Sequence, residues 1–189
     1  MAQIPLSNLS DRKILLGVSG GVAAFKAVAL TSLLRQSQAQ VEVIMTKAAT
    51  QLIGPASFQA FTGRAVKTNI FVAQESVTSN HIQLAQWADI FVIAPATANT
   101  LAGLSWGFGH NLLTCTALAV TCPILLAPAM NTHMWNNPIV RDNVRRLKEF
   151  GFHFVGPTQG HLSCGTSGPG RMVEAEEIYS AIINLLDGR

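Results

Sequence analysis

The 189-residue sequence is 49% hydrophobic and only 12% charged, with a net charge of +3 and one dense basic stretch at residues 141–148. At helical spacing that stretch indicates a solvated helix face, so composition argues against a nucleic-acid-binding protein. The low share of charged residues favours a homo-oligomer, because few charges remain to cover a monomer's surface.

Short apolar runs alternate with amphipathic stretches in the first half of the chain. Residues 13–19 predict a buried strand, and residues 21–36 predict a helix whose apolar stripe excludes Lys26. A second strand is expected at 41–46. The helical stretch that follows, at 49–63, is broken at Gly54–Pro55, since proline interrupts a helix.

The second half continues the alternation. A weak extended segment near 65–71 leads to Ser79–Asn80, which the sequence predicts as the cap of a helix carrying His81. The remaining elements expected from the pattern are strands at 90–95, 123–129 and 152–157, helices at about 97–104, 110–120, 134–150 and 175–187, and a Gly/Pro-rich loop at 161–172.

Strands that alternate with helices over this length predict a parallel sheet covered by helices on both faces. We therefore expect an α/β fold of three layers, αβα, with a Rossmann-like or flavodoxin-like sheet. No linker or internal repeat divides the sequence, so residues 1–189 are predicted to form a single domain.

Several function classes are excluded by composition and pattern. Three cysteines without a Cys-x-x-Cys pair predict neither a disulfide framework nor a zinc site, and the histidines lack ligand spacing, so no metal is expected. The uncharged run at 90–140 is interrupted by prolines and glycines, which argues against a membrane span. The N-terminus does not resemble a signal peptide, and we expect a cytoplasmic protein.

The residues that follow the predicted strands are small, hydroxylated or amide-bearing. In open parallel sheets ligands bind beyond the carboxyl ends of the strands, where glycines and helix N-termini receive phosphates. The segment at 17–24, GVSGGVAA, lacks the dinucleotide fingerprint, and no triphosphate-binding loop is present. A mononucleotide such as FMN is favoured. The strand-end residues are Ser19–Gly20–Gly21, Thr46–Lys47–Ala48, residues 96–100 and Met130–Asn131–Thr132.

Four motifs occur along the chain in this order: GVSGGVAAFK (17–26), APATANT (94–100), APAMNTHMW (127–135) and SCGTSGPGRM (163–172). Together they resemble the homo-oligomeric flavin-containing cysteine decarboxylases, over about residues 12–180. The segment at 128–135, with the pattern P-x-M-N-x-x-M-W, is specific to that family. The greatest similarity is to its branch in coenzyme A biosynthesis, which decarboxylates 4′-phosphopantothenoylcysteine.

The resemblance implies an FMN-dependent route to 4′-phosphopantetheine. FMN oxidises the cysteinyl thiol to a thioaldehyde, CO2 leaves, and reduced FMN returns hydride to the enethiol. The family's catalytic histidine matches His81, and the cysteine that supplies the last proton matches Cys164. The substrate-binding asparagine matches Asn131, with Met130 beside it. Arg171 is expected near the substrate and Cys164. Asn131 has a second interpretation, as the cap of the following helix.

The resemblance also implies the cofactor contacts and the assembly. We expect a homotrimer or dodecamer with sites at subunit interfaces, a small thiol substrate, and no nucleic-acid or membrane partner. A chain of this length is expected to carry no fused synthetase domain. The implied FMN contacts are Ser19, Gly20, Gly21, Val22, Thr46, Lys47, Thr97, Asn99, Thr100 and Ala129.

The sequence departs from the family pattern at three positions. The family commonly has an acidic residue where His110 stands, a basic one at Gln86 and an acidic one at Thr166. These departures bear on substrate identity more than on fold or cofactor. Two alternative functions remain: decarboxylation of a peptide C-terminal cysteine or another thiol, and flavin-dependent regulation without turnover. Cys164 argues against the peptide substrate, because peptide-acting relatives do not need the reducing cysteine.

Overall fold

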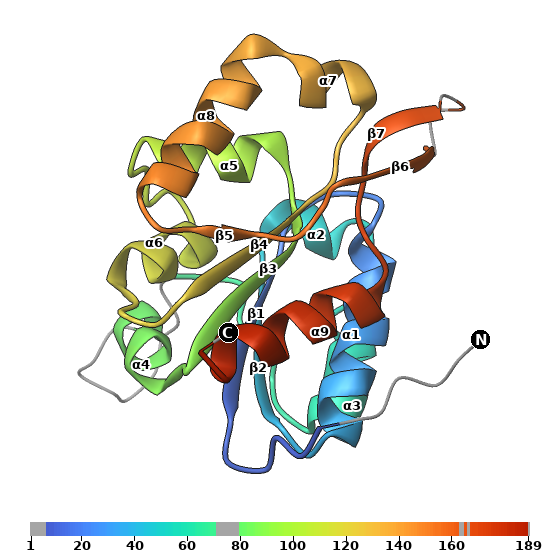
Figure 1. Ribbon diagram of the computed structural model, residues 1–189. Coiled ribbons are helices and arrows are strands. Elements are labelled where there is room, and N and C mark those ends of the chain that lie inside the picture. The colour runs from blue at the N-terminus through green and yellow to red at the C-terminus, as the bar shows by residue number, and fades with distance from the viewer. Residues whose placement is uncertain (1–6, 71–79, 163–164, 166, 189) are drawn as a thin grey trace.

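The computed structural model describes residues 7–70, 80–162, 165 and 167–188. Within these ranges, five strands form one parallel sheet and two more form a separate antiparallel hairpin (Figure 1). In chain order the strands are β1 (Lys13–Val18), β2 (Gln40–Met45), β3 (Ile90–Ala96), β4 (Ile124–Pro128), β5 (His153–Phe154), β6 (Thr158–His161) and β7 (Ser167–Arg171).

Helices connect the strands of the main sheet and close the chain (Figure 1). They are α1 (Ala24–Gln36), α2 (Lys47–Thr50), α3 (Ala56–Thr62), α4 (Asn80–Trp87), α5 (Ala98–Ser105), α6 (Leu112–Ala119), α7 (Thr132–Asn136), α8 (Pro138–Glu149) and α9 (Ala175–Leu186).

The main sheet has the strand order β2-β1-β3-β4-β5, and every neighbouring pair is parallel. This is the flavodoxin-like order. The chain places β2 on one side of β1 and then adds β3, β4 and β5 in turn on the other side, so the topological switch point lies between β1 and β3. The predicted three-layer α/β fold is thus confirmed, as are the five predicted strands. The last of them, β5, is only two residues long and shorter than expected.

The alternation of side chains along β1 explains the two outer layers. Ile14, Leu16 and Val18 face one core with α1, α3 and α9, while Leu15 faces a second core with α4, α5, α6 and α8. Both cores are almost fully buried, as expected for a parallel sheet covered on both sides. Figure 1 shows α1, α3 and α9 on one side of the sheet and α4, α5, α6 and α8 on the other.

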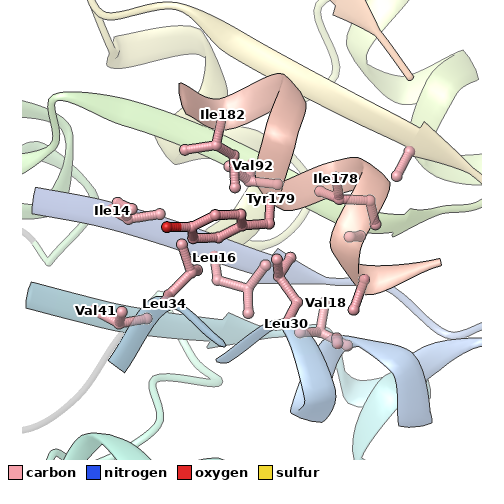
Figure 2. Packing of buried hydrophobic residues seen from close by; sticks show 14 of the residues in the cluster. Ile14, Leu16, Val18, Leu30, Leu34, Val41, Val92, Ile178, Tyr179 and Ile182 are labelled. Atoms are coloured by element: carbon pink, nitrogen blue, oxygen red, sulfur yellow. The ribbon is translucent and has the colours of Figure 1, made fainter. Parts of the chain in front are cut away.

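Tyr179 anchors the C-terminal helix in the first core. Its ring is 2% exposed and lies among side chains of β1, α1 and α9 in Figure 2. The phenolic oxygen lies 2.7 Å from Ser37 Oγ and accepts a hydrogen bond from the amide of Ser7 at 2.9 Å. Its polar end is therefore satisfied while its ring fills the core.

The prediction of a single helix at 134–150 is wrong, because the structure has two helices there, α7 and α8. Asn137 ends the first and caps the second, accepting a hydrogen bond from the amide of Ile139 at 2.9 Å. Pro138 occupies the first position of α8, where its missing N–H costs nothing. The expected solvated face of α8 is confirmed: Arg145 is exposed and pairs with Glu149 at 2.7 Å.

The Gly/Pro-rich segment near the end of the chain was expected to be a loop and is instead largely a hairpin. β6 and β7 pair in antiparallel fashion, with Gly160 opposite Gly168 and Gln159 opposite Pro169. Glycine and proline weaken strands, but a strand can still form where another backbone packs closely against it. Such a backbone lies beside β7, because α7 contacts it.

Lys67, in the extended segment expected near 65–71, forms an isolated parallel bridge with Ile44 of β2. Its N–H donates to Val43 O and its C=O accepts from Met45 N, both at 2.9 Å. The outer edge of β2 is therefore partly covered. In the part of the chain that the structure describes, no helix is long and apolar enough to cross a bilayer.

Candidate cofactor and substrate site

A cavity of about 1250 Å³ opens at the carboxyl edge of the main sheet. Ser19, Thr46, Thr97 and Ala129 line it, and each of these residues directly follows a strand, respectively β1, β2, β3 and β4. Parallel strands bring their carboxyl ends to one edge, so four segments far apart in sequence meet here. The cavity lies at the edge where the sequence places a ligand.

The glycine loop after β1 brings backbone close to this cavity. A Cβ on Gly20 would lie 2.4 Å from the Cβ of Ala48, so only glycine fits at this position. The backbone amides of Gly20, Val22 and Ala23 have no hydrogen-bond partner among the described residues, and all three residues line the cavity. Unpartnered amides before α1 form a cradle for an anionic group.

A second helix begins at the same cavity. Thr97 caps α5 by accepting a hydrogen bond from the amide of Thr100 at 3.3 Å. The amides of Ala98 and Asn99, in the first turn of α5, have no partner within the described ranges, and both residues line the cavity. The positive ends of α1 and α5 thus converge on one space, which favours a phosphate there.

All ten residues predicted as cofactor contacts line this cavity. The structure therefore brings together four segments whose residues are separated by up to 110 positions in sequence. Their role as cofactor contacts stays a prediction. They are Ser19, Gly20, Gly21, Val22, Thr46, Lys47, Thr97, Asn99, Thr100 and Ala129.

Two of the three predicted substrate residues line the same cavity. Met130 and Arg171 line it. Asn131 is not among the lining residues; it follows Met130 and caps α7, accepting a hydrogen bond from the amide of His133 at 2.8 Å. The cap expected as its alternative role is confirmed. Its role in substrate binding stays a prediction, which the cap does not contradict.

Of the two predicted catalytic residues, the structure describes only His81. His81 lies in the first turn of α4 and does not line it, and its Nδ1 is buried without a hydrogen-bond partner in the described part of the chain. Cys164 lies outside the described residues, as does Thr166. The catalytic roles of His81 and Cys164 therefore stay predictions.

Sequence reasoning missed several residues of the cavity wall. His110 was noted only as a departure from the family pattern, yet it lines the cavity, as does His161 of β6. Phe25 and Met134 also line it and are 62% and 47% exposed. Both lie within the motifs at 17–26 and 127–135, but no role was predicted for either side chain, since each resembles an ordinary exposed position of a helix.

One ion-pair network borders the cavity. The Nζ of Lys26 donates to Glu174 Oε1 at 2.9 Å, and Nη2 of Arg171 donates to the same oxygen at 2.6 Å. The hydrogen bond from Lys26 is the main cause that holds the pKa of Glu174 below its usual range, against a smaller opposing effect of burial. Glu174 is thus a carboxylate shared by two cations, one buried and one half-exposed.

The two described cysteines lie away from this network. Cys115 donates to the carbonyl oxygen of Gly109 at 2.8 Å, and burial raises the pKa of Cys122 above its usual value. A raised pKa leaves little reactive thiolate, in accord with the packing role expected for Cys122. Among the residues that the structure describes, no three His, Cys, Asp or Glu side chains are grouped to hold a metal ion.

Comparison with curated proteins shows close relatives over most of the chain. The sequence is 45% identical over 170 residues to the coenzyme A biosynthesis bifunctional protein CoaBC of Bacillus subtilis, covering 90% of this chain and 42% of that protein. The chain thus spans less than half the length of the CoaBC relatives. It is also 42% identical to the probable phosphopantothenoylcysteine decarboxylase of Streptococcus mutans, covering 90% of this chain and 97% of that one.

Solved structures show the same fold. A PPC decarboxylase mutant complexed with pantothenoylaminoethenethiol matches with a TM-score of 0.84 at 34% identity, covering 93% of this chain and 98% of that one. The FMN-dependent cysteine decarboxylase SpaF matches with a TM-score of 0.83 at 34% identity, covering 95% and 97%. The flavoprotein family model matches residues 3–187. The motifs, the fold and these similarities agree, and the chain belongs to the flavoprotein family.

Proposed function

We propose that this chain is an FMN-dependent decarboxylase that converts 4′-phosphopantothenoylcysteine to 4′-phosphopantetheine. The observation that carries the proposal is a single cavity that extends from the glycine loop at Gly20 to the Met130–Arg171 region. The Streptococcus mutans relative, matched over nearly its whole length, supports the substrate. We further propose that residues 1–189 form one flavoprotein domain acting in the cytoplasm, on the continuous family match and the free thiols of Cys115 and Cys122.

The residues present fit FMN. A phosphate needs several donors, and the residues that carry the unpartnered amides before α1 and in the first turn of α5 line one cavity. Gly20 lets the loop pack tightly against Ala48 at the cavity wall, and the apolar side chains of Val22, Leu52 and Met130 suit a flat ring system. Bound FMN would supply two-electron oxidation of the substrate thiol, which makes loss of CO2 favourable, and the later return of hydride.

Asn131 would orient the substrate carboxylate. Its Oδ1 accepts a hydrogen bond from the amide of His133, and Nδ2 is the end of the side chain that donates. An uncharged donor can hold a carboxylate without forming a salt bridge that would oppose decarboxylation. In this proposal His81 removes the thiol proton, and Cys164 gives the last proton to the product.

The position of His81 supports a site shared between subunits. In one chain it does not line the cavity, while Val22 and Phe25 at the cavity are 61% and 62% exposed. Exposed apolar side chains beside a cavity mark a surface that a partner can cover. We therefore propose a homo-oligomer, a trimer or dodecamer, in which a second copy brings its His81 to the cavity.

The first test is the product mass after incubation of the purified, flavin-loaded protein with 4′-phosphopantothenoylcysteine. Loss of CO2 alone would support the complete reaction. Loss of CO2 with two further hydrogens would show an enethiol that is not reduced, and would contradict the role given to Cys164. Unchanged substrate from a flavin-loaded protein would overturn the substrate and direct the search to another thiol or to a regulatory role.

Subunit mixing tests the shared site. We expect His81→Asn and Asn131→Asp each to abolish turnover as pure variants. Unfolding and reassembling the two together should restore part of the activity, because some interfaces would carry both wild-type residues. Light scattering gives the assembly size. A monomer, or mixed samples without any restored activity, would contradict the proposed arrangement.

A further inference from the structure

Lys26 is a buried cation held by a distant segment of the chain. It lies in the first turn of α1, at the wall of the cavity, and is 7% exposed. Its Nζ donates to the carbonyl oxygen of Met172 and to Glu174 Oε1, both at 2.9 Å. A buried ammonium requires such partners, since an unpaired buried charge is strongly unfavourable. The segment directly after β7 is therefore fixed to the start of α1.

The opposite side of β7 lies against the predicted substrate segment. The amide of Met130 donates to Gly170 O at 2.9 Å. A Cβ on Gly170 would lie 2.4 Å from Met130 O, and one on Gly168 would lie 2.6 Å from Thr132 Oγ1. That hydroxyl is buried without a hydrogen-bond partner within the described ranges. Backbone packs against backbone here, so a shift of β7 must displace Met130–Thr132.

These contacts form a continuous connection through the site. The glycine loop leads into α1, Lys26 of α1 holds the end of β7, and β7 supports Met130 next to Asn131. Arg171 also donates to Glu174, but its side chain is 42% exposed, so water can replace that contact. Among the described Lys and Arg residues, only Lys26 is both buried and hydrogen-bonded to the backbone directly after β7, at Met172 O.

We propose that Lys26 is a positioning residue that fixes the Met130–Asn131 segment relative to the glycine loop. By this connection it sets the distance between the substrate and the cofactor, an inference that rests on the proposed function. A misplacement of about 1 Å between reacting groups can lower a rate about a hundredfold. The effect of Lys26 on turnover is thus expected to act through β7.

The test compares Lys26→Met, Lys26→Arg and a control, Arg145→Met, which removes an exposed cation with two acidic partners on α8. Hydrogen exchange is followed by mass spectrometry in the flavin-loaded protein without substrate. In Lys26→Met we expect peptides covering 129–134 and 167–173 to exchange about ten times faster, as for loss of a hydrogen bond to a charged group. Lys26→Arg should restore most of the protection, and Arg145→Met should match the wild type.

Kinetics give the second readout. We expect Lys26→Met to keep its flavin content while kcat falls ten- to a hundredfold, with partial recovery in Lys26→Arg. The exchange measurement needs no turnover, so it decides the inference even if the protein does not decarboxylate 4′-phosphopantothenoylcysteine. Should residues 129–134 exchange as in the wild type, or should all peptides exchange faster together, the inference is wrong.

If Lys26→Met does not fold, Gly168→Ala tests the same connection from the other side. Its added methyl group would push against Thr132 while Lys26 stays intact. Faster exchange confined to 129–134 and 167–173 would support the connection. Unchanged exchange in this variant would overturn it.

Discussion

The hydroxyl of Ser19 donates a hydrogen bond to the carbonyl oxygen of Pro95 at 2.6 Å and accepts one from the amide of Thr97 at 3.1 Å. Ser19 is 1% exposed, so these bonds are shielded from water. They join the end of β1 to the end of β3, where the two loops that line the cavity diverge. One buried side chain thus joins the loops that lead into α1 and α5, where the phosphate is proposed to bind.

Ser19→Ala should therefore weaken both stability and flavin binding. It removes the only acceptor of the part-buried Thr97 amide among the described residues and leaves Pro95 O with the longer bond from the backbone amide of residue 19, at 3.3 Å. We expect a loss of about 1–3 kcal/mol in the free energy of unfolding. Urea unfolding and flavin titration measure the two effects. Ser180→Ala is a matched control, since that hydroxyl bonds Glu176 O on an exposed helix face. Equal stability losses in the two variants would contradict this account.

Gly20→Ala should abolish flavin retention. The added Cβ would lie 2.4 Å from the Cβ and 3.0 Å from the carbonyl carbon of Ala48, so the loop or α2 must move. Gly54→Ala is the control, because no atom lies within 4 Å of a Cβ at that position. The absorbance ratio of flavin to protein after purification reports the result. A Gly20→Ala protein as yellow as Gly54→Ala would show that the loop does not form the cradle.

Asn143→Ala should destabilise the second core. Asn143 is 3% exposed, and its Oδ1 accepts hydrogen bonds from Ser105 Oγ at 2.8 Å and Trp106 Nε1 at 3.2 Å. Without this acceptor, the hydroxyl of Ser105 keeps its bond to Ala102 O at 3.1 Å but loses the shorter bond to Asn143. The shortened side chain also leaves a small space between α5 and α8. We expect a loss of about 1–3 kcal/mol in thermal or urea unfolding. The exposed residue Asn136 provides a control substitution to alanine.

The carboxylate of Glu174 should make the free energy of unfolding depend on pH. Its pKa is lowered in the folded protein, chiefly by the hydrogen bond from Lys26, so the folded state binds this proton less readily than the unfolded chain. The stabilising contribution is present above the ordinary pKa near 4.5 and disappears as the pH falls through the lower folded value.

Unfolding of Glu174→Gln across pH 3–7 checks this sign. We expect the variant to be less stable than the wild type at neutral pH and the difference to shrink below about pH 4. Glu176→Gln, on the exposed side of α9, controls for removal of a carboxylate. A difference between Glu174→Gln and the wild type that stays constant down to pH 3 would count against the ion pair.

The five strands of the main sheet were predictable because each is a short apolar run, and the helices between them carry apolar stripes. The division of α7 from α8 was also present in the sequence, as Asn137 followed by Pro138. The hairpin was not predictable. Gly168 and Gly170 have little tendency to form a strand, and β7 depends on its contact with Met130–Thr132, which local pattern does not reveal.

The residues of the candidate site also fall into those that could be predicted from the sequence and those that could not. Residues that end strands, such as Thr97 and Ala129, could be placed at one edge because parallel topology fixes where strand ends meet. Lys26 lay off the apolar stripe of its helix, and its burial comes from Met172 and Glu174, far away in sequence. In the proposed assembly, the relation of His81 to the cavity depends on how chains pack together, a property that a helix pattern does not encode.

The two edges of the main sheet have a consequence for how this protein avoids aggregation. One edge strand, β5, offers only two residues, and the other, β2, has part of its outer backbone bonded by Lys67. Neither edge presents a long row of open backbone groups to another chain, a common route to fibril growth. Crowding at high expression levels is therefore not expected to extend the main sheet from one molecule to the next.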